Sequence, residues 1–259
     1  MGVILAAERI AFSYPGKSSP TFQNLSFGVS PGEIICVLGP NGVGKSTLLR
    51  CLAGLAPTSS GTVRLDGEPI ATLPRAEVAK RLALVPQSYE TVFAFSVRTV
   101  VEMGRAPHLG WFDTPGREVA GLVRDALHTL GIAHLADAAY TEISGGERQL
   151  VQIARVLVQA PKLMILDEPT AHLDFANQAR FLSLTRRLAK AGLAVIFTTH
   201  APDHAFGLAD QTLILSPNYP PSLGATRDIL TEAMLSRTYG VPIRLIGDGG
   251  HIACIAEVD

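Results

Sequence analysis

The feature that most constrains this chain is a wholly apolar pentapeptide, Ile34–Leu38, followed at once by a glycine-rich loop over residues 39–46. A run that is apolar on both faces is typical of a central strand in a parallel sheet. A helical pattern over residues 47–53 follows the loop and stops at Gly54. Strand, glycine-rich loop and helix in this order form the setting in which backbone N–H groups and a helix N-terminus bind phosphate. The sequence therefore predicts an α/β fold that binds a nucleotide.

The loop residues have the chemistry that phosphate binding requires. Glycines let the backbone turn successive N–H groups inward. We expect Lys45 to meet the β- and γ-phosphates and Ser46 to ligate Mg²⁺. The alternative, a glycine turn with a surface lysine, does not require a buried strand before the loop and a helix after it. The predicted phosphate-binding residues are Gly39, Pro40, Asn41, Gly42, Val43, Gly44, Lys45, Ser46 and Thr47.

A second apolar strand pattern, Leu163–Leu166, ends in two carboxylates, Asp167 and Glu168. Acidic residues at the carboxyl end of a strand lie where α/β sheets bind ligands, and beside the phosphate loop if the two strands are neighbours. We expect Asp167 to hold Mg²⁺ through water and Glu168 to polarise an attacking water as a general base. The alternative is a solvated acidic turn, and the presence of the phosphate loop favours the catalytic interpretation.

The other patterns predict a mostly parallel sheet with an antiparallel β part at its N-terminal side. Apolar runs at residues 82–85 and 193–197 alternate with helical patterns, which favours parallel strands covered on both faces. Alternating apolar residues near residues 25–29, and again before the turn at residues 66–67, indicate antiparallel strands within residues 1–70.

Residues 87–140 have helical periodicity and no convincing strand, which predicts an inserted helical subdomain. The core is then expected to comprise residues 1–86 and 141–259. Within the insertion, Ser96 is placed to cap one helix, and a second is expected between Gly116 and Gly131. A further helix is expected over residues 231–239, before Gly240 and Pro242.

Composition excludes several classes of protein. The hydrophobic share is 47% and the mean hydropathy is +0.26, yet the apolar runs are far shorter than the ~18 residues that span a bilayer. With 22 basic and 23 acidic residues there is no basic excess to displace counterions, so no nucleic-acid partner is expected. The N-terminus lacks the features of a secretory signal. Three cysteines in apolar stretches indicate reduced thiols and no metal site.

The tetrapeptide Ser144-Gly145-Gly146-Glu147 opens another helical pattern. Ser144 and Glu147 are spaced as a capping box, which is a sufficient structural explanation of those two residues. That explanation does not require two consecutive glycines, which weaken the first turn of a helix. Bare backbone at a helix N-terminus suits a close approach by a second phosphate.

With these residues, the sequence resembles the nucleotide-binding subunits of ATP-binding cassette (ABC) transporters over essentially the whole chain. Residues 143–147 resemble the family's signature, usually Leu-Ser-Gly-Gly-Gln, with Ile and Glu at its ends. The order of phosphate loop, Gln87, signature, acidic pair and His200 also matches. The resemblance implies ATP and Mg²⁺ as cofactors, and two subunits that enclose two ATP molecules head to tail. Ser144, Gly145, Gly146 and Glu147 would then contact the ATP on a second copy.

The resemblance implies roles for further residues. Tyr14 resembles the aromatic that stacks on adenine, although it is also explained as an ordinary strand aromatic. Gln87 resembles the glutamine that reaches Mg²⁺ and the attacking water, and His200 resembles the switch histidine that contacts the γ-phosphate. Asp174 ends a segment that is usually Ser-Ala-Leu-Asp and crosses the dimer interface. Here His172 replaces the usual alanine, and we assign it no catalytic role.

A single cassette with a helical subdomain resembles an importer whose permease is a separate chain, because exporters commonly fuse the two and ribosome-acting members usually carry two cassettes. Residues 96–108 and 235–242 resemble the branch that serves iron-siderophore, haem and cobalamin uptake. Residues 92–96 also resemble molybdate and tungstate cassettes, so an oxyanion importer stays open. A soluble ABC ATPase without a transport role is the alternative from another class.

The resemblance also implies partners. They are a second copy of the chain in a homodimer, two transmembrane permease subunits and, indirectly, a periplasmic or extracellular substrate-binding protein. The permease is expected to dock near residues 87–96, at the groove between core and helical subdomain. The expected location is peripheral, on the cytoplasmic face of the inner (plasma) membrane. Cargo specificity in importers belongs to the other chains, so this sequence does not identify the cargo.

Overall fold

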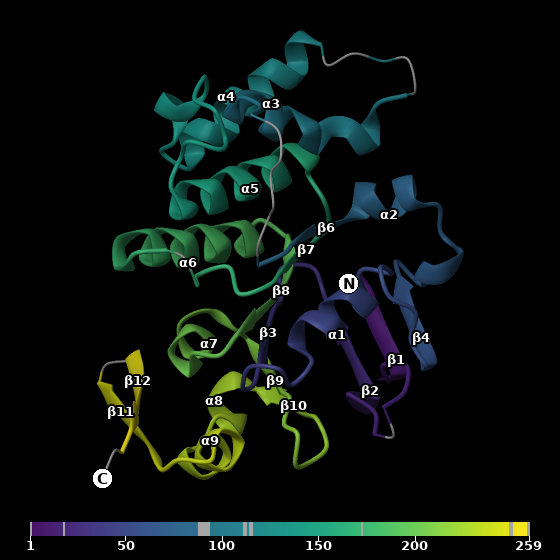
Figure 1. Ribbon diagram of the computed structural model, residues 1–259, viewed down its shortest axis with the longest axis vertical. Helices are drawn as coiled ribbons and strands as arrows, with labels where there is room; N and C mark the ends of the chain where they lie inside the picture. The colour runs from purple at the N-terminus through teal and green to yellow at the C-terminus, as the bar shows by residue number, and fades with distance from the viewer. Residues whose placement is uncertain are drawn as a thin grey trace.

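A six-stranded sheet, ordered β10-β9-β3-β8-β7-β6, forms the centre of the computed structural model (Figure 1). The structure describes residues 2–17, 19–87, 94–110, 113, 116–171, 173–248 and 251–257. The strands are β3 (Ile34–Leu38), β6 (Leu82–Val85), β7 (Leu163–Leu166), β8 (Ala194–Thr199), β9 (Gln211–Ile214) and β10 (Ser222–Ala225). Five of them run parallel and β10 is antiparallel to β9, which confirms the predicted fold class.

The apolar central strands are buried because both faces of the sheet are covered. Every residue of β3 and of β7 is buried. Successive side chains of a strand point to opposite faces, so Ile34 and Cys36 belong to one apolar cluster while Ile35 and Val37 belong to the other. The pattern of unbroken apolar residues therefore correctly predicted strands that lie inside a layered α/β core.

An antiparallel sheet, ordered β2-β1-β4-β5, covers part of one face. Its strands are β1 (Leu5–Phe12), β2 (Phe22–Val29), β4 (Ser60–Leu65) and β5 (Glu68–Pro69). Helix α1 (Lys45–Leu52) lies between the two sheets, and its buried Leu48 and Leu52 share an apolar cluster with Leu5 of β1 and Ile35 of β3. The phosphate loop at the start of α1 is thus held by both sheets. The short helices η1 (Ile70–Thr72) and α2 (Arg75–Arg81) link this part to β6.

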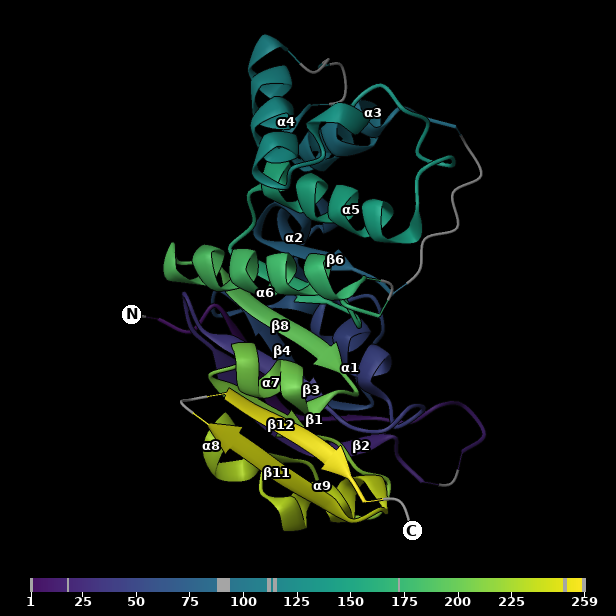
Figure 2. The same ribbon diagram turned by 90° about the vertical axis from the view of Figure 1, so that its left-hand side faces the viewer.

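The helical insertion occupies the top of Figures 1 and 2. It contains α3 (Val97–Glu102), η2 (Met103–His108), α4 (Arg117–Thr129) and η3 (Ala133–Leu135). Ser96 caps α3, and its hydroxyl accepts a hydrogen bond from the Thr99 N–H at 3.2 Å, as expected. Helix α5 (Gly145–Gln159), beyond the predicted boundary at residue 140, packs along α3 and α4 and also contacts β6. It therefore links the insertion to the sheet, and the division of the chain at these boundaries stays a prediction.

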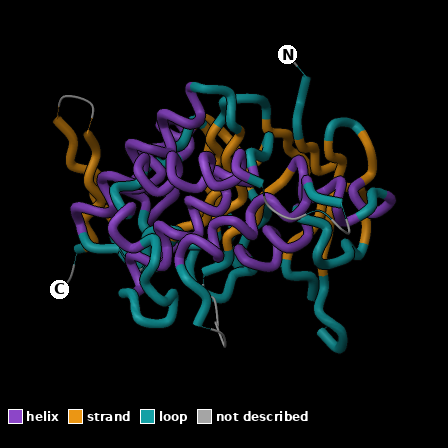
Figure 3. The backbone as a smooth tube through the Cα atoms, turned by 90° about the horizontal axis from the view of Figure 1, so that it is seen from above, coloured by secondary structure: helices purple, strands orange, loops and turns teal. Residues whose placement is uncertain are grey.

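Four further helices lie in the described C-terminal part of the chain. They are α6 (Phe175–Lys190), α7 (Pro202–Leu208), α8 (Thr226–Ile229) and α9 (Glu232–Tyr239). Helix α9 was predicted: Thr231 caps its start, and Gly240 ends it in a left-handed conformation with φ 73°. The hairpin of β11 (Ile243–Asp248) and β12 (His251–Ala256) was not predicted. Figure 3 shows it on the opposite side of the molecule from the antiparallel sheet. Among the described residues, no helix is long and apolar enough to cross a bilayer.

Candidate functional site

The phosphate loop leaves the carboxyl end of β3 and curls tightly before α1. Gly42 and Gly44 have φ values of 78° and 108°, in the region that residues with a side chain rarely adopt. A Cβ at Gly44 would also lie 2.3 Å from Cγ2 of Thr21. The Lys45 ammonium is buried under the loop and donates hydrogen bonds to the carbonyls of Gly39 at 2.9 Å and Pro40 at 3.2 Å. The curl therefore encloses a positive charge.

Glu168 brings together residues from four parts of the chain. Its Oε1 lies 3.3 Å from Nζ of Lys45, and its Oε2 lies 3.3 Å from both Nε2 of Gln87 and Nδ1 of His200. Strand β7, which ends two residues before Glu168, is not a neighbour of β3, because β8 lies between them. The acidic side chain nevertheless reaches the loop lysine. The side chain of Glu168 is 11% exposed, so this cluster is largely removed from water.

Thr198 fixes the acidic pair, and the sequence analysis missed it. Its hydroxyl donates to Oδ1 of Asp167 at 2.7 Å and accepts from the Glu168 N–H at 2.8 Å. Glu168 has φ 45°, an uncommon conformation for a residue with a side chain, and persists there only if its surroundings hold it. The available signal was a threonine inside the apolar pattern that precedes His200. Asp167 is 7% exposed and Thr198 is fully buried.

A cavity of about 990 Å³ opens above this cluster, within the size range of small-molecule sites. Lys45, Gln87 and Glu168 line it, together with much of the phosphate loop. The predicted loop residues in its wall are Asn41, Gly42, Val43, Gly44, Lys45, Ser46 and Thr47. Two further segments, residues 19–23 and 215–221, also line it and were not predicted.

Tyr14 lies at the wall of the same cavity. Its hydroxyl and that of Thr47 are 2.6 Å apart, which ties the residue to the first turn of α1. Its ring packs edge-on against Phe12 with centroids 5.0 Å apart, and the residue is 49% exposed. An aromatic face is therefore available at the cavity, as stacking on a base requires.

The signature residues lie elsewhere. Ser144, Gly145, Gly146 and Glu147 form the start of α5, and Asp174 caps α6; none of them lines this cavity as the described residues of one chain form it. The predicted capping box is present: the Ser144 N–H donates to Glu147 at 2.8 Å and the Glu147 N–H donates back to the Ser144 hydroxyl at 3.3 Å. The Ser144 hydroxyl and N–H also lower the pKa of the Glu147 carboxyl. His172 lies outside the described residues.

The side chains near the phosphate loop fit Mg²⁺ only if nucleotide phosphates and water supply the other ligands. In the part of the chain that the structure describes, no group of three or more His, Cys, Asp and Glu side chains is placed to hold a metal. Mg²⁺ is usually bound by one or two carboxylates together with substrate phosphates and water. Asp167, the exposed Ser46 and Gln87 fit such a partial set.

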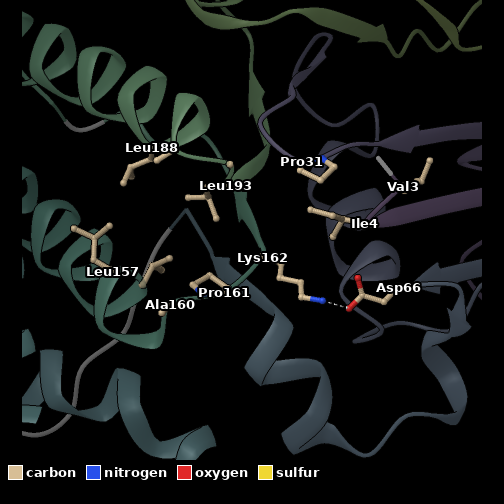
Figure 4. A pocket seen from close by; sticks show the side chains of 14 residues that line it. Val3, Ile4, Pro31, Asp66, Leu157, Ala160, Pro161, Lys162, Leu188 and Leu193 are labelled. Carbon is tan, nitrogen blue, oxygen red and sulfur yellow. Dashed lines mark hydrogen bonds and ion pairs between the residues drawn. The ribbon is translucent and has the colours of Figure 1, made fainter. Parts of the chain in front are cut away.

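A second cavity, of about 760 Å³, lies at the amino ends of the central strands, away from this site (Figure 4). Pro31, Lys162 and Leu193, which precede β3, β7 and β8, line it. Lys162 and Asp66, the charged side chains in its wall, pair with each other at 2.9 Å. The rest of the wall consists of apolar side chains and backbone, so its chemistry does not suit a polyphosphate.

The strand, loop and helix around a buried lysine, with an acidic pair at the end of β7, define a phosphate-loop nucleotide-binding protein of the α/β class. A family model described as "ABC transporter" matches residues 22–171, more than half of the chain. The chain therefore belongs to the ABC transporter family, as its ATP-binding subunit, and is an ATPase.

Relatives of known family are similar in sequence to this chain over most of their own length. The chain is 37% identical to the hemin import ATP-binding protein HmuV of Rhodococcus jostii, covering 94% of this chain and 82% of the relative. It is 38% identical to the molybdate import ATP-binding protein MolC of Haemophilus influenzae, covering 94% of this chain and 90% of the relative.

Solved structures of ABC transporter proteins have the same fold as this chain. A metal-chelate type ABC transporter in an inward-facing conformation is similar with a TM-score of 0.86, 34% identity, and coverage of 99% of this chain and 98% of that one. The cbiO1 protein of Clostridium perfringens, described as part of the ABC transporter complex cbiONQ, has a TM-score of 0.78 and 29% identity, with coverage of 92% and 94%.

Proposed function

We propose that this chain is the ATP-hydrolysing subunit of an ABC importer that energises uptake of a metal chelate, such as an iron-siderophore, haem or cobalamin, through a separate permease. The convergence of Lys45, Gln87 and His200 on Glu168, which lines the cavity, carries the proposal. The hemin import relative and the metal-chelate type structure support this class of cargo.

In the proposed site, the phosphate loop holds the phosphates of ATP and Tyr14 stacks on the adenine. Phosphate oxygens compete with Glu168 for the Lys45 ammonium, because charge-assisted hydrogen bonds to phosphate are strong. Glu168, freed from that ion pair, accepts a proton from the attacking water, while His200 contacts the γ-phosphate. Ser46, Gln87 and Asp167 would hold Mg²⁺, which would supply positive charge to neutralise the phosphates.

The remaining signature residues act across a homodimer in this proposal. Ser144, Gly145, Gly146 and Glu147 approach the ATP held by a second copy, and Asp174 lies at the same interface. In the cavity wall that the described residues of one chain form, these residues take no part, which supports this arrangement. Phe175, next to Asp174, is 89% exposed, which suits a residue that a second subunit covers.

The dimer is proposed to act on two permease subunits from the cytoplasmic face of the inner membrane, and a substrate-binding protein delivers the cargo on the other side. Closure around ATP closes the cytoplasmic ends of the permease, and hydrolysis reopens them. The proposed docking groove lies near residues 87–96, of which 88–93 lie outside the described part of the chain.

The relative MolC favours a second candidate cargo, molybdate, and the sequence resemblance leaves tungstate open beside it. Co-expression with candidate permeases, followed by measurement of what the associated binding protein captures, separates a chelate from an oxyanion. Stable co-purification with a polytopic permease supports import. ATPase stimulation by DNA or ribosomes, without permease binding, would instead establish a non-transport ABC ATPase.

Glu168→Gln tests the catalytic assignment. The variant is expected to bind ATP and to accumulate as an ATP-bound dimer in size-exclusion chromatography, with hydrolysis nearly abolished, because an amide does not accept the proton of water. Glu77→Gln, a surface change away from the cavity, is the matched control. Near-normal turnover by Glu168→Gln would remove Glu168 from the role of general base.

A further inference from the structure

The backbone of the switch histidine is held by a residue that no motif identifies. The Tyr239 hydroxyl donates a hydrogen bond to the carbonyl oxygen of His200 at 2.9 Å, across 39 residues of chain. His200 is 54% exposed, so packing restrains its side chain little. Its side-chain Nδ1 lies 3.3 Å from Oε2 of Glu168. The tyrosine therefore anchors the main chain from which the imidazole reaches the carboxylate.

Tyr239 is itself well fixed. It is the last residue of α9, a short helix that Thr231 caps at its start and Gly240 closes at its end. Leu235, one turn earlier, is fully buried in the apolar cluster that also contains Ile34 and Cys36 of β3. Burial raises the pKa of Tyr239 well above its ordinary value, so the phenol keeps its proton at neutral pH and stays a donor.

A second contact holds the residues that follow His200. The Cys254 N–H of β12 donates to Oδ1 of Asp203, in the first turn of α7, at 2.7 Å. Strand β12 packs on α7, and β11 packs on α9 (Figure 2). Residues 200–203 are therefore attached at both ends to the C-terminal module of α9, β11 and β12.

We propose that Tyr239 is a positioning residue for His200, and that the C-terminal module formed by α9, β11 and β12 thereby belongs to the catalytic machinery. This inference rests on the proposed function, because it assigns His200 a role at the γ-phosphate. Tyr239 touches neither nucleotide nor water in this account; it fixes the peptide that carries the imidazole.

Removal of the Tyr239 contact is expected to lower turnover for a geometric reason. A catalytic group held by its backbone at one point and by a 3.3 Å side-chain contact at another loses alignment when the backbone anchor is removed. Small displacements of a positioned group lower turnover without removing the group. In the proposed function the adenine and the phosphates are held by Tyr14 and the phosphate loop, so nucleotide affinity is expected to be unaffected.

The test is Tyr239→Phe in the full-length chain, which removes one hydroxyl and keeps the ring. A neutral hydrogen bond corresponds to a three- to tenfold effect on rate, so kcat for ATP hydrolysis is expected to fall by roughly that factor while KM changes less than twofold. Tyr140→Phe is the control: it also removes a phenol hydrogen bond, here the one that Gln152 of α5 donates to the Tyr140 hydroxyl at 2.7 Å, and should leave kcat and KM unchanged.

A kcat for Tyr239→Phe within twofold of the unmodified chain, or a loss that Tyr140→Phe reproduces, would overturn the inference. An increase in KM with constant kcat would also overturn it. Should Tyr239→Phe fail to fold, Asp203→Ala removes the second attachment and is expected to lower kcat at constant KM; an unchanged kcat would then refute the proposal. If the unmodified chain hydrolyses no ATP, the proposed function has failed, which is a separate and distinguishable result.

Discussion

Thr198→Val should destabilise the protein strongly, because Thr198 satisfies two buried groups of the acidic pair. Its hydroxyl donates to Asp167 and accepts from the Glu168 N–H, and the side chain is fully buried. Valine has nearly the same shape, so the change removes hydrogen bonds without opening a cavity. A lost hydrogen bond to a charged group costs about 1.5–3 kcal/mol, and a stranded N–H adds about 1–3 kcal/mol. We therefore expect the free energy of unfolding to fall by roughly 3–5 kcal/mol.

Thr212→Val is the matched control for that measurement. Thr212 is also a fully buried threonine of the six-stranded sheet, but within the described part of the chain its hydroxyl pairs only with the neutral hydroxyl of Thr226, at 2.9 Å. Its replacement should cost about 1–2 kcal/mol. Chemical denaturation followed by circular dichroism measures both values, and the Tm of Thr198→Val should fall by on the order of 10 °C. A cost for Thr198→Val no larger than for Thr212→Val would refute the assignment of Thr198 as the support of the acidic pair.

Three other substitutions test local geometry. Gly44→Ala and Gly42→Ala both introduce a side chain at positive φ, which costs about 1–3 kcal/mol. Only Gly44→Ala also meets Thr21, so denaturation should show it to be the less stable variant, and equal stability would contradict the packing of the loop. Ser144→Ala should cost about 1 kcal/mol and raise the pKa of Glu147 toward its ordinary value, since Ser144 lowers it in the folded chain. The capping box thus stabilises α5 above the ordinary carboxyl pKa and weakens as pH falls through the lowered one. An unchanged NMR titration of Glu147 in the variant would exclude that contact.

Features encoded over a few neighbouring residues were predictable from the sequence. The apolar run of β3, the glycines before Lys45 and the capping residues Ser96 and Ser144 each determine their structure within one or two turns of chain. The stop of α9 at Gly240 belongs to the same class, because only a residue without a side chain adopts its left-handed φ easily.

Features that depend on contacts between distant segments were not predictable. Nothing local indicates that β8 lies between β3 and β7, or that Thr198 supports Asp167. The wall of the cavity at residues 215–221 and the contact of Tyr239 with His200 likewise arise from how the C-terminal segment packs. The strands of the C-terminal hairpin were not predicted, because a short segment of mixed polarity shows no clear period in its hydrophobic pattern.

The most direct test of the account is the affinity of the chain for ATP, measured by isothermal titration with Mg²⁺ present for the unmodified chain, Lys45→Ala and Lys80→Ala. Lys45 is buried under the phosphate loop, whereas Lys80 pairs with Glu77 on the surface. Loss of a charge-assisted contact of about 1.5–3 kcal/mol should raise the Kd of Lys45→Ala roughly 10- to 150-fold. Lys80→Ala should bind as the unmodified chain does. Equal ATP affinity for Lys45→Ala and the unmodified chain would contradict the central claim that this loop holds the nucleotide.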